Sequence, residues 1–203
     1  MISPSSNNQN KSSAIDPSLK KHQLKKYRSP ASGFMWPGPR LERALNKATI
    51  RSPFLRWLLS FVFLPLAWRF GMRINYSLEN FFVEVPHKKL VRNTYGTVGG
   101  AALLANLELA AGSYLFMRTD GGHRMVCRNV TYRFMLPSSN GLHFKVEPMN
   151  EEDLEASIQS GKPFNTSLKV KVFSRGKQSG KPERCIGRGE VRFHLWAIQE
   201  PYE

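Results

Sequence analysis

Hydrophobic and polar residues alternate in six segments of the chain, which is the pattern typical of β-strands. The first two segments, at residues 72–76 and 81–85, predict a hairpin that ends at Pro86. The other four lie at residues 124–134, 141–147, 167–173 and 188–196. Together the six segments predict an antiparallel sheet in an α+β fold.

A long apolar segment separates the second of these strands from the third. In residues 101–111 only Asn106 and Glu108 are polar. A helix that is apolar on nearly every side must also be buried on nearly every side. We therefore expect a helix over about residues 97–111 that lies inside the sheet.

Residues that often cap helices indicate where the helices begin and end. Thr97 or Asn93 would cap the start of the long helix, and Gly112 would end it. A short acidic helix is expected to start at residues 150–154, with Asn150 as its cap and carboxylates in its first turn.

The first 70 residues differ in composition from the rest. Residues 1–39 are rich in Ser, Asn, Lys and Pro, and they contain too few apolar groups to form a core, so we expect a flexible basic arm. Residues 40–70 predict two helices that lead into a domain at residues 71–203. The first helix has an apolar face at Leu41, Ala44, Leu45 and Ala48.

The second N-terminal helix, at residues 53–70, is the most apolar part of the chain. Its uncharged run is only about a dozen residues long, whereas a spanning helix needs about 20. Two interpretations remain open. The helix packs against its own domain or a partner subunit, or it lies peripherally on an anionic membrane.

The charge balance narrows the classes of partner. The chain has 30 Lys+Arg and 15 Asp+Glu, a net charge of +15, which favours nucleic acid, anionic membrane or phosphorylated cofactors. Nucleic acid is disfavoured, because no aromatic-interleaved strand motif or recognition helix is visible. Cys127 and Cys185 lack the spacing of a zinc site or a disulfide framework, so no metal is expected. With no secretory signal in the first ten residues, we expect a cytoplasmic protein with reduced thiols.

The most specific motif surrounds the start of the long helix. It reads Asn-x-x-Gly-x-x-Gly-Gly-Ala at residues 93–101, and Glu108 follows in the helix. The motif resembles the Asn-x-x-Gly-x-x-His-Gly-Gly…Asp/Glu signature of phenylacetyl-CoA-type hotdog thioesterases. Gly99 stands at the position of the family's His, and Ala101 stands at that of its second Gly.

Three further segments extend the resemblance to about residues 53–196. They are a Gly-x-x-Ile strand start at Gly71, a Phe-x-x-Pro strand end at Phe134 and the Glu-Glu-Asp-Leu of the short helix. These segments look most similar to an uncharacterised thioesterase-like branch of the superfamily. The resemblance implies a hotdog fold, in which a bent antiparallel sheet wraps around one long buried helix. The N-terminal helices would be additions to that fold.

The same residues suit the hydrolysis of a thioester. A Gly-rich helix start at Gly99 and Gly100 supplies backbone N–H groups and a favourable dipole to an oxygen that becomes negative. Gly96 and Thr97, in the loop before the helix, are candidates for substrate binding. Glu108 is a candidate base or nucleophile, because it is a carboxylate in an otherwise apolar helix.

The resemblance adds roles that the residues alone do not give. It implies that Asn93 polarises the thioester carbonyl or orients water, and that Glu108 comes from the other subunit of a dimer. The implied substrate is an acyl-CoA thioester, with no cofactor. We expect a homodimer or a dimer of dimers, because the edges of a single sheet need covering.

Each site residue also has a purely structural interpretation. Asn93 can cap a helix, Glu108 can pair with an arginine in a dimer interface, and the glycine pair can let helix and sheet approach closely. Since the family's His is missing, the main alternative is a protein that binds acyl-CoA or lipid without hydrolysing it. Enoyl-thioester hydration is disfavoured, because the sequence lacks the usual Asp-x-x-x-x-His pair.

Overall fold

The structure is a computed structural model, and it describes residues 38–52, 54, 65–77, 79–175 and 184–198. Within these residues six strands form one sheet in the order β1-β2-β4-β5-β6-β3, and every neighbouring pair is antiparallel. The strands are β1 (Arg73–Asn75), β2 (Phe82–Val85), β3 (His123–Phe134), β4 (Leu142–Pro148), β5 (Phe164–Ser174) and β6 (Arg184–Ala197). Each coincides, within a few residues at its ends, with a segment of alternating polarity, and β1 and β2 pair as the predicted hairpin.

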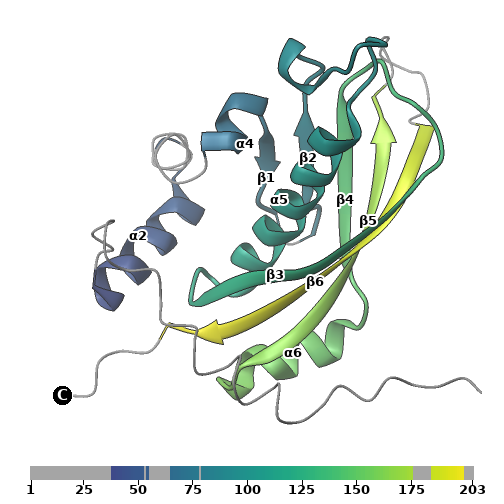
Figure 1. Ribbon diagram of the computed structural model, residues 1–203. Coiled ribbons are helices and arrows are strands. Elements are labelled where there is room, and N and C mark those ends of the chain that lie inside the picture. Colours follow the sequence, from purple (N-terminus) through teal and green to yellow (C-terminus); the bar gives the residue numbers. More distant parts are fainter. Residues whose placement is uncertain (1–37, 53, 55–64, 78, 176–183, 199–203) are drawn as a thin grey trace, which may run out of the picture. The chain divides into compact units, whose positions relative to one another are not determined.

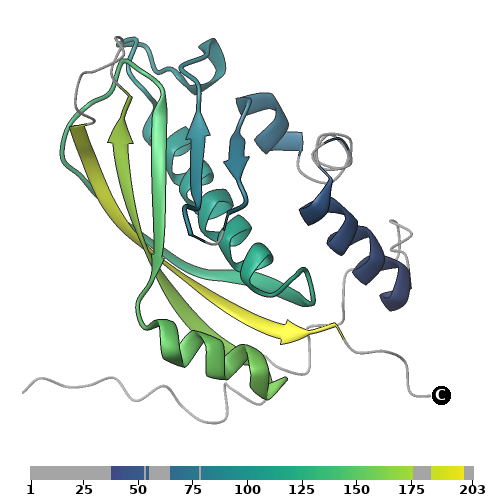
Figure 2. The same ribbon diagram turned by 180° about the vertical axis from the view of Figure 1, so that it is seen from behind.

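The long helix α5 (Gly100–Arg118) lies against the concave face of the bent sheet (Figures 1 and 2). Its fully buried residues pack against inward-facing residues of the strands, such as Val83, Phe144, Leu168 and Val191. By length and composition alone α5 could cross a membrane, but here it is the core helix of a sheet. The α+β class and the hotdog arrangement expected from the sequence are confirmed.

Neither expected end of α5 is correct. The cap position is Gly99, which makes no side-chain cap, so Asn93 and Thr97 do not cap this helix. The helix also passes through Gly112 and ends at Arg118. A glycine inside a helix costs only about 1 kcal/mol, and the buried residues of the last two turns outweigh that cost.

One stripe of α5 is open to solvent in the single chain. Ala101, Leu104 and Glu108, which lie three and four residues apart and therefore share one side of the helix, are exposed. The expected burial on nearly every side is thus incomplete within one chain. The strand β3 is also open along one edge, because it lies at the end of the sheet and, among the described residues, pairs only with β6.

Two shorter helices differ in how well the sequence predicted them. In α6 (Glu151–Ser160) the side chain of Asn150 accepts hydrogen bonds from the N–H groups of Glu152 and Asp153, as expected of a cap. In α2 (Pro39–Arg51) the expected apolar face is not the buried one: Leu41 is 56% exposed, whereas Glu42 is buried.

Polar contacts attach α2 to the rest of the fold. Arg124 of β3 donates hydrogen bonds from both Nε and Nη2 to the carboxylate of Glu42, at 3.1 and 2.6 Å. Asn46 donates to the backbone oxygen of Gly121 at 2.8 Å. The periodicity of α2 predicted the helix but not its orientation, because these polar contacts determine which side faces the domain.

The remaining N-terminal predictions lie mostly outside the described residues. The basic arm is not described before residue 38, and of residues 53–70 only Phe54 and the helix α4 (Pro65–Phe70) are described. A short 3-10 helix, η1 (Lys89–Val91), follows β2 and leads to the motif.

A glycine of β6 lets Tyr132 of β3 pack closely against the sheet. A Cβ atom on Gly187 would overlap the Tyr132 hydroxyl and would lie 2.6 Å from the backbone oxygen of Arg133. Because the backbone oxygen of Arg133 cannot move without shifting the edge strand, we expect Gly187→Ala to lower the free energy of unfolding by about 2 kcal/mol. Urea denaturation measures this change.

Gly112 provides the matched control for that substitution. A Cβ atom there would make ordinary contacts, 3.8 Å from Phe193 and 3.9 Å from Met125. Since alanine is a better helix former, Gly112→Ala should stabilise the protein by up to about 1 kcal/mol. A Gly187→Ala variant as stable as the parent would contradict the close packing of Tyr132.

Candidate active site

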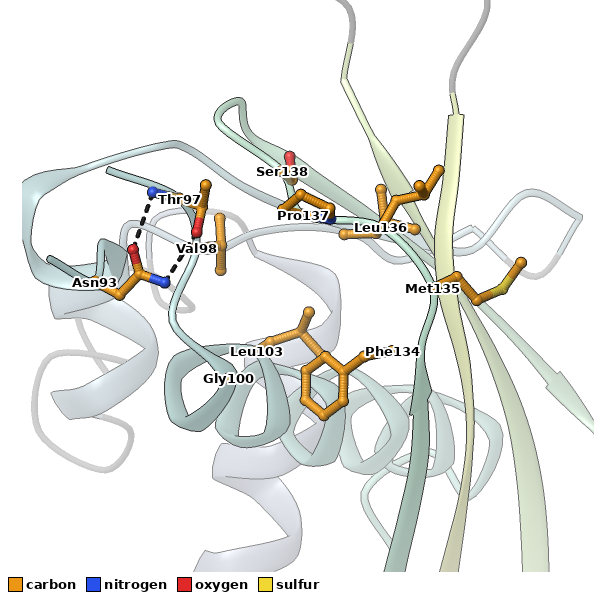
Figure 3. Close-up of a pocket in the computed structure, with 11 residues that line it drawn as sticks. Asn93, Thr97, Val98, Gly100, Leu103, Phe134, Met135, Leu136, Pro137 and Ser138 are labelled. Carbon is orange, nitrogen blue, oxygen red and sulfur yellow. Dashed lines mark hydrogen bonds between the residues drawn. The ribbon is translucent and has the colours of Figure 1, made fainter. Parts of the chain in front are cut away.

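A cavity of about 340 Å³ lies at the start of α5, and Figure 3 shows the residues that line it. Three elements enclose it: the turn at residues 93–98, the first turn of α5, and the chain that leaves β3 at residues 134–138. Of the residues expected at the site, Asn93, Thr97 and Gly100 line this cavity, and Gly96 and Gly99 lie in the same turn.

Asn93 holds the turn that leads into α5. Its Oδ1 accepts hydrogen bonds from the backbone N–H groups of Tyr95 and Thr97, at 3.0 and 3.1 Å. Its Nδ2 donates to Thr97 Oγ1 at 2.9 Å, as Figure 3 shows. Gly96 has a φ of +75°, a left-handed conformation that favours glycine. Nδ2 carries two hydrogens, so one of them remains for an oxygen of a ligand.

The start of α5 presents backbone N–H groups that have no acceptor within the helix. Gly99 N–H is already used, because it donates to the backbone oxygen of Val91 at 2.8 Å. The first hydrogen bond of the helix runs from Leu103 N–H to Gly99 C=O at 2.9 Å. The N–H groups of residues 100–102 precede this bond and remain for an external acceptor. Gly100, rather than Gly99, is therefore the glycine whose N–H can polarise a carbonyl oxygen.

Most of the cavity wall is apolar, and the sequence interpretation did not assign these residues to a site. Phe134, Met135 and Leu136 are 57%, 49% and 41% exposed, which is unusual for three consecutive large apolar residues. The ring of Phe134 lies over Gly100, where a Cβ atom would be 3.4 Å from its Cζ. The other apolar residues of the wall are Val98, Leu103, Pro137 and Ile186. A run of apolar residues at the end of an edge strand is the signal that could have indicated this wall.

Glu108 does not belong to this cavity in the same chain. It lies eight residues after Gly100 on α5, about 12 Å along the helix axis. It is exposed, and it lies near Cys127 of β3. Burial, and secondly the charge of Glu108, raise the pKa of the Cys127 thiol. Glu108 therefore lies on the exposed stripe of α5, at the open side of the fold and near the edge strand β3.

The geometry of the cavity suits the polarisation of a carbonyl group. Among the described residues no group of three or more His, Cys, Asp or Glu could hold a metal ion. The cavity instead combines free backbone N–H groups, the positive end of a helix and an amide hydrogen of Asn93, all beside an apolar wall.

Comparison with known proteins supports the fold. No family model matches the sequence, and no curated protein matches it. Among solved structures, a thioesterase family protein from Silicibacter pomeroyi is similar over 75% of this chain and 98% of its own, with 15% identity and a TM-score of 0.55. A protein of unknown function from Chlorobaculum tepidum is similar over 77% of this chain and 96% of its own, with 13% identity and a TM-score of 0.60.

A third similar structure is a variant of a thioesterase enzyme from Staphylococcus aureus. It covers 64% of this chain and 98% of its own, with 15% identity and a TM-score of 0.50. At such low identities the likeness describes the arrangement of the chain and not its chemistry. The described residues thus have the hotdog fold, which they share with thioesterase-family proteins of known structure.

Proposed function

We propose that the protein is a thioesterase that hydrolyses an acyl-CoA thioester to a free acid and CoA. The observation that carries this proposal is the set of unpaired N–H groups at residues 100–102, beside an apolar cavity of about 340 Å³. Such donors stabilise the negative oxygen that forms when a nucleophile attacks a carbonyl. The apolar wall at Phe134 and Leu136 suits the part of the acyl group next to the reacting carbon.

The reaction needs few groups from the protein. The thioester oxygen would accept hydrogen bonds from Gly100 N–H and from the second hydrogen of Asn93 Nδ2. Glu108 would remove a proton from water as the water oxygen bonds to the carbonyl carbon. The carbon–sulfur bond then breaks, and the CoA thiolate leaves and takes up a proton. Direct attack by the carboxylate of Glu108, followed by hydrolysis of the anhydride, gives the same products.

These roles require two copies of the chain, because Glu108 and the cavity lie apart in one copy. We propose that the Glu108 of one copy faces the cavity of the other in a homodimer. The exposed stripe of α5 and the open edge of β3 lie on the same side of the fold, as the proximity of Glu108 and Cys127 indicates. Antiparallel pairing of two β3 edges would cover both.

The Gly99 position limits the rate that we expect. The hotdog thioesterases that the motif resembles have a His at this position, whereas Gly99 has no side chain. The oxyanion donors and Glu108 would have to act without an imidazole. A protein that binds acyl-CoA but does not hydrolyse it is therefore the alternative function for the same cavity.

A panel of acyl-CoA thioesters of different acyl groups tests both functions. We expect purified protein to release free thiol from at least one member of the panel, because the oxyanion donors and the carboxylate are both present. Isothermal titration of the same panel measures binding independently of turnover. Binding without thiol release would favour the non-catalytic alternative, and failure of both measurements would refute an acyl-CoA site.

A further inference from the structure

The outer face of the sheet, opposite α5, carries a row of cations across four neighbouring strands. The registers place Lys145 of β4 opposite Lys171 of β5, Lys171 opposite Arg188 of β6, and Arg188 opposite Arg133 of β3. Residues directly opposite in antiparallel strands point to the same side, about 5 Å apart. The four side chains therefore form one line across the sheet, which we call the basic row.

Like charges placed opposite each other in a sheet repel and destabilise it. Nearby carboxylates relieve only part of this repulsion. Glu147 pairs with Lys171 at 3.1 Å, and Glu190 lies 3.8 Å from Arg192, which is outside the row. Within the described part of the chain, Arg133 and Arg188 have no carboxylate within ion-pair distance. Two exposed arginines thus lie opposite each other, and neither is in an ion pair with Glu190, the carboxylate two residues beyond Arg188 on the same face.

A groove of about 430 Å³ lies at the end of the basic row that Arg188 and Arg133 form. Arg133, Arg188, Lys169 and the hydroxyl-bearing Thr131 line it, together with Tyr132, Met149, Gly189 and Glu190. The groove is separate from the cavity at the start of α5, since the two share no lining residue. Two arginines whose Cβ atoms lie about 5 Å apart can each bind one phosphate in a bidentate manner.

We propose that this groove binds a small ligand through a diphosphate group, with Arg133 and Arg188 each contacting one phosphate. The charge of Lys169 offsets that of Glu190, which lies opposite it in the register and lines the same groove. A second copy of the same face would not fit here, because it would oppose one basic row with another. The groove is concave and small, so a small anion fills it better than the flat surface of a protein partner would. The site does not depend on the proposed thioester hydrolysis.

Inorganic pyrophosphate is the simplest probe for this site. At millimolar concentration it should raise the melting temperature of the full chain by about 3 °C more than KCl at the same ionic strength. In low salt and without ligand, the variant Arg188→Gln should melt at a higher temperature than the parent. The substitution removes the charge repulsion of Arg188 with its neighbours Lys171 and Arg133. The same variant should bind pyrophosphate at least about tenfold more weakly by titration calorimetry.

Lys89→Gln, an exposed charge on η1 outside the sheet, is the matched control and should change neither property. Arg133→Gln provides a second variant if Arg188→Gln fails to fold.

Titrations with ADP and CoA distinguish the sources of the diphosphate. If ADP or CoA binds more tightly than pyrophosphate, the ligand is a nucleotide; if they bind equally, the ligand is the free diphosphate. A melting shift no larger than that of KCl, or an equal pyrophosphate affinity in parent and Arg188→Gln, would overturn the site.

Discussion

Replacement of Gly100 by proline should lower the turnover of an acyl-CoA substrate by about 10²–10³-fold, the effect typical of losing one oxyanion donor. Proline removes the N–H group and yet fits the first position of a helix, where that N–H has no partner in the helix. The preceding residue, Gly99, already has φ −69° and ψ 139°, which is the conformation favoured before proline. Thiol release by the purified variant, with its melting temperature measured in parallel, checks this expectation.

Gly100→Ala is the control for the proline variant. Alanine adds nearly the same contact with Phe134, at 3.4 Å, but it keeps the N–H group. We expect its turnover to stay within about threefold of the parent, because the donor is unchanged. If proline and alanine lowered turnover equally, crowding against Phe134 would be the cause, and the oxyanion role of Gly100 would be wrong.

Replacement of Glu108 by glutamine should cut turnover by about 10²-fold or more while acyl-CoA binding is retained. Glutamine keeps the size of the side chain but cannot accept the proton of water. Because Glu108 is exposed in the single chain and has no ion pair among the described residues, the variant should keep its melting temperature. A loss of stability with unchanged chemistry would instead identify a structural charge in the dimer interface.

A mixture of the two inactive variants tests whether the site is shared between copies. In a dimer of one Gly100→Pro chain and one Glu108→Gln chain, one site would combine the intact Gly100 of one copy with the intact Glu108 of the other. After subunit exchange the mixture should recover about a quarter of the parent activity, since half of the dimers would each have one intact site. No recovery in a mixture that has exchanged subunits would place both residues in one chain.

The sequence predicted the elements of this fold better than it predicted their ends. Strands of period two and an apolar helix specify which residues face a core, and this is sufficient for the six strands and α5. Gly112 did not end α5, because burial of Tyr114, Leu115 and Met117 outweighs a weak local preference. Similarly, the apolar face of α2 did not predict its orientation, which depends on the contact between Glu42 and Arg124.

The sequence predicted which residues would lie together better than it predicted which of their atoms face the cavity, and their roles stay a prediction. The motif placed Asn93, Thr97 and Gly100 around one cavity. Which glycine keeps a free N–H depends on the bond between Gly99 and Val91, and no sequence pattern encodes that bond. The walls at Phe134 and Leu136 come from a strand end 34 residues or more beyond Gly100, so only the folded chain brings them to the motif.

The position of β3 at the end of the sheet also has a consequence for the synthesis of the protein. Its register partners in β6 run from Gly187, opposite Phe134, to Ala197, opposite His123, so β3 cannot complete this pairing until those later residues have left the ribosome. During that time a strand of 12 residues has neither edge covered. Arg124, Arg128 and Arg133 are spread along this strand, and such charges are a common protection of uncovered strands against aggregation. The same arginines that remain on the surface of the finished fold would thus protect the nascent chain before β6 exists.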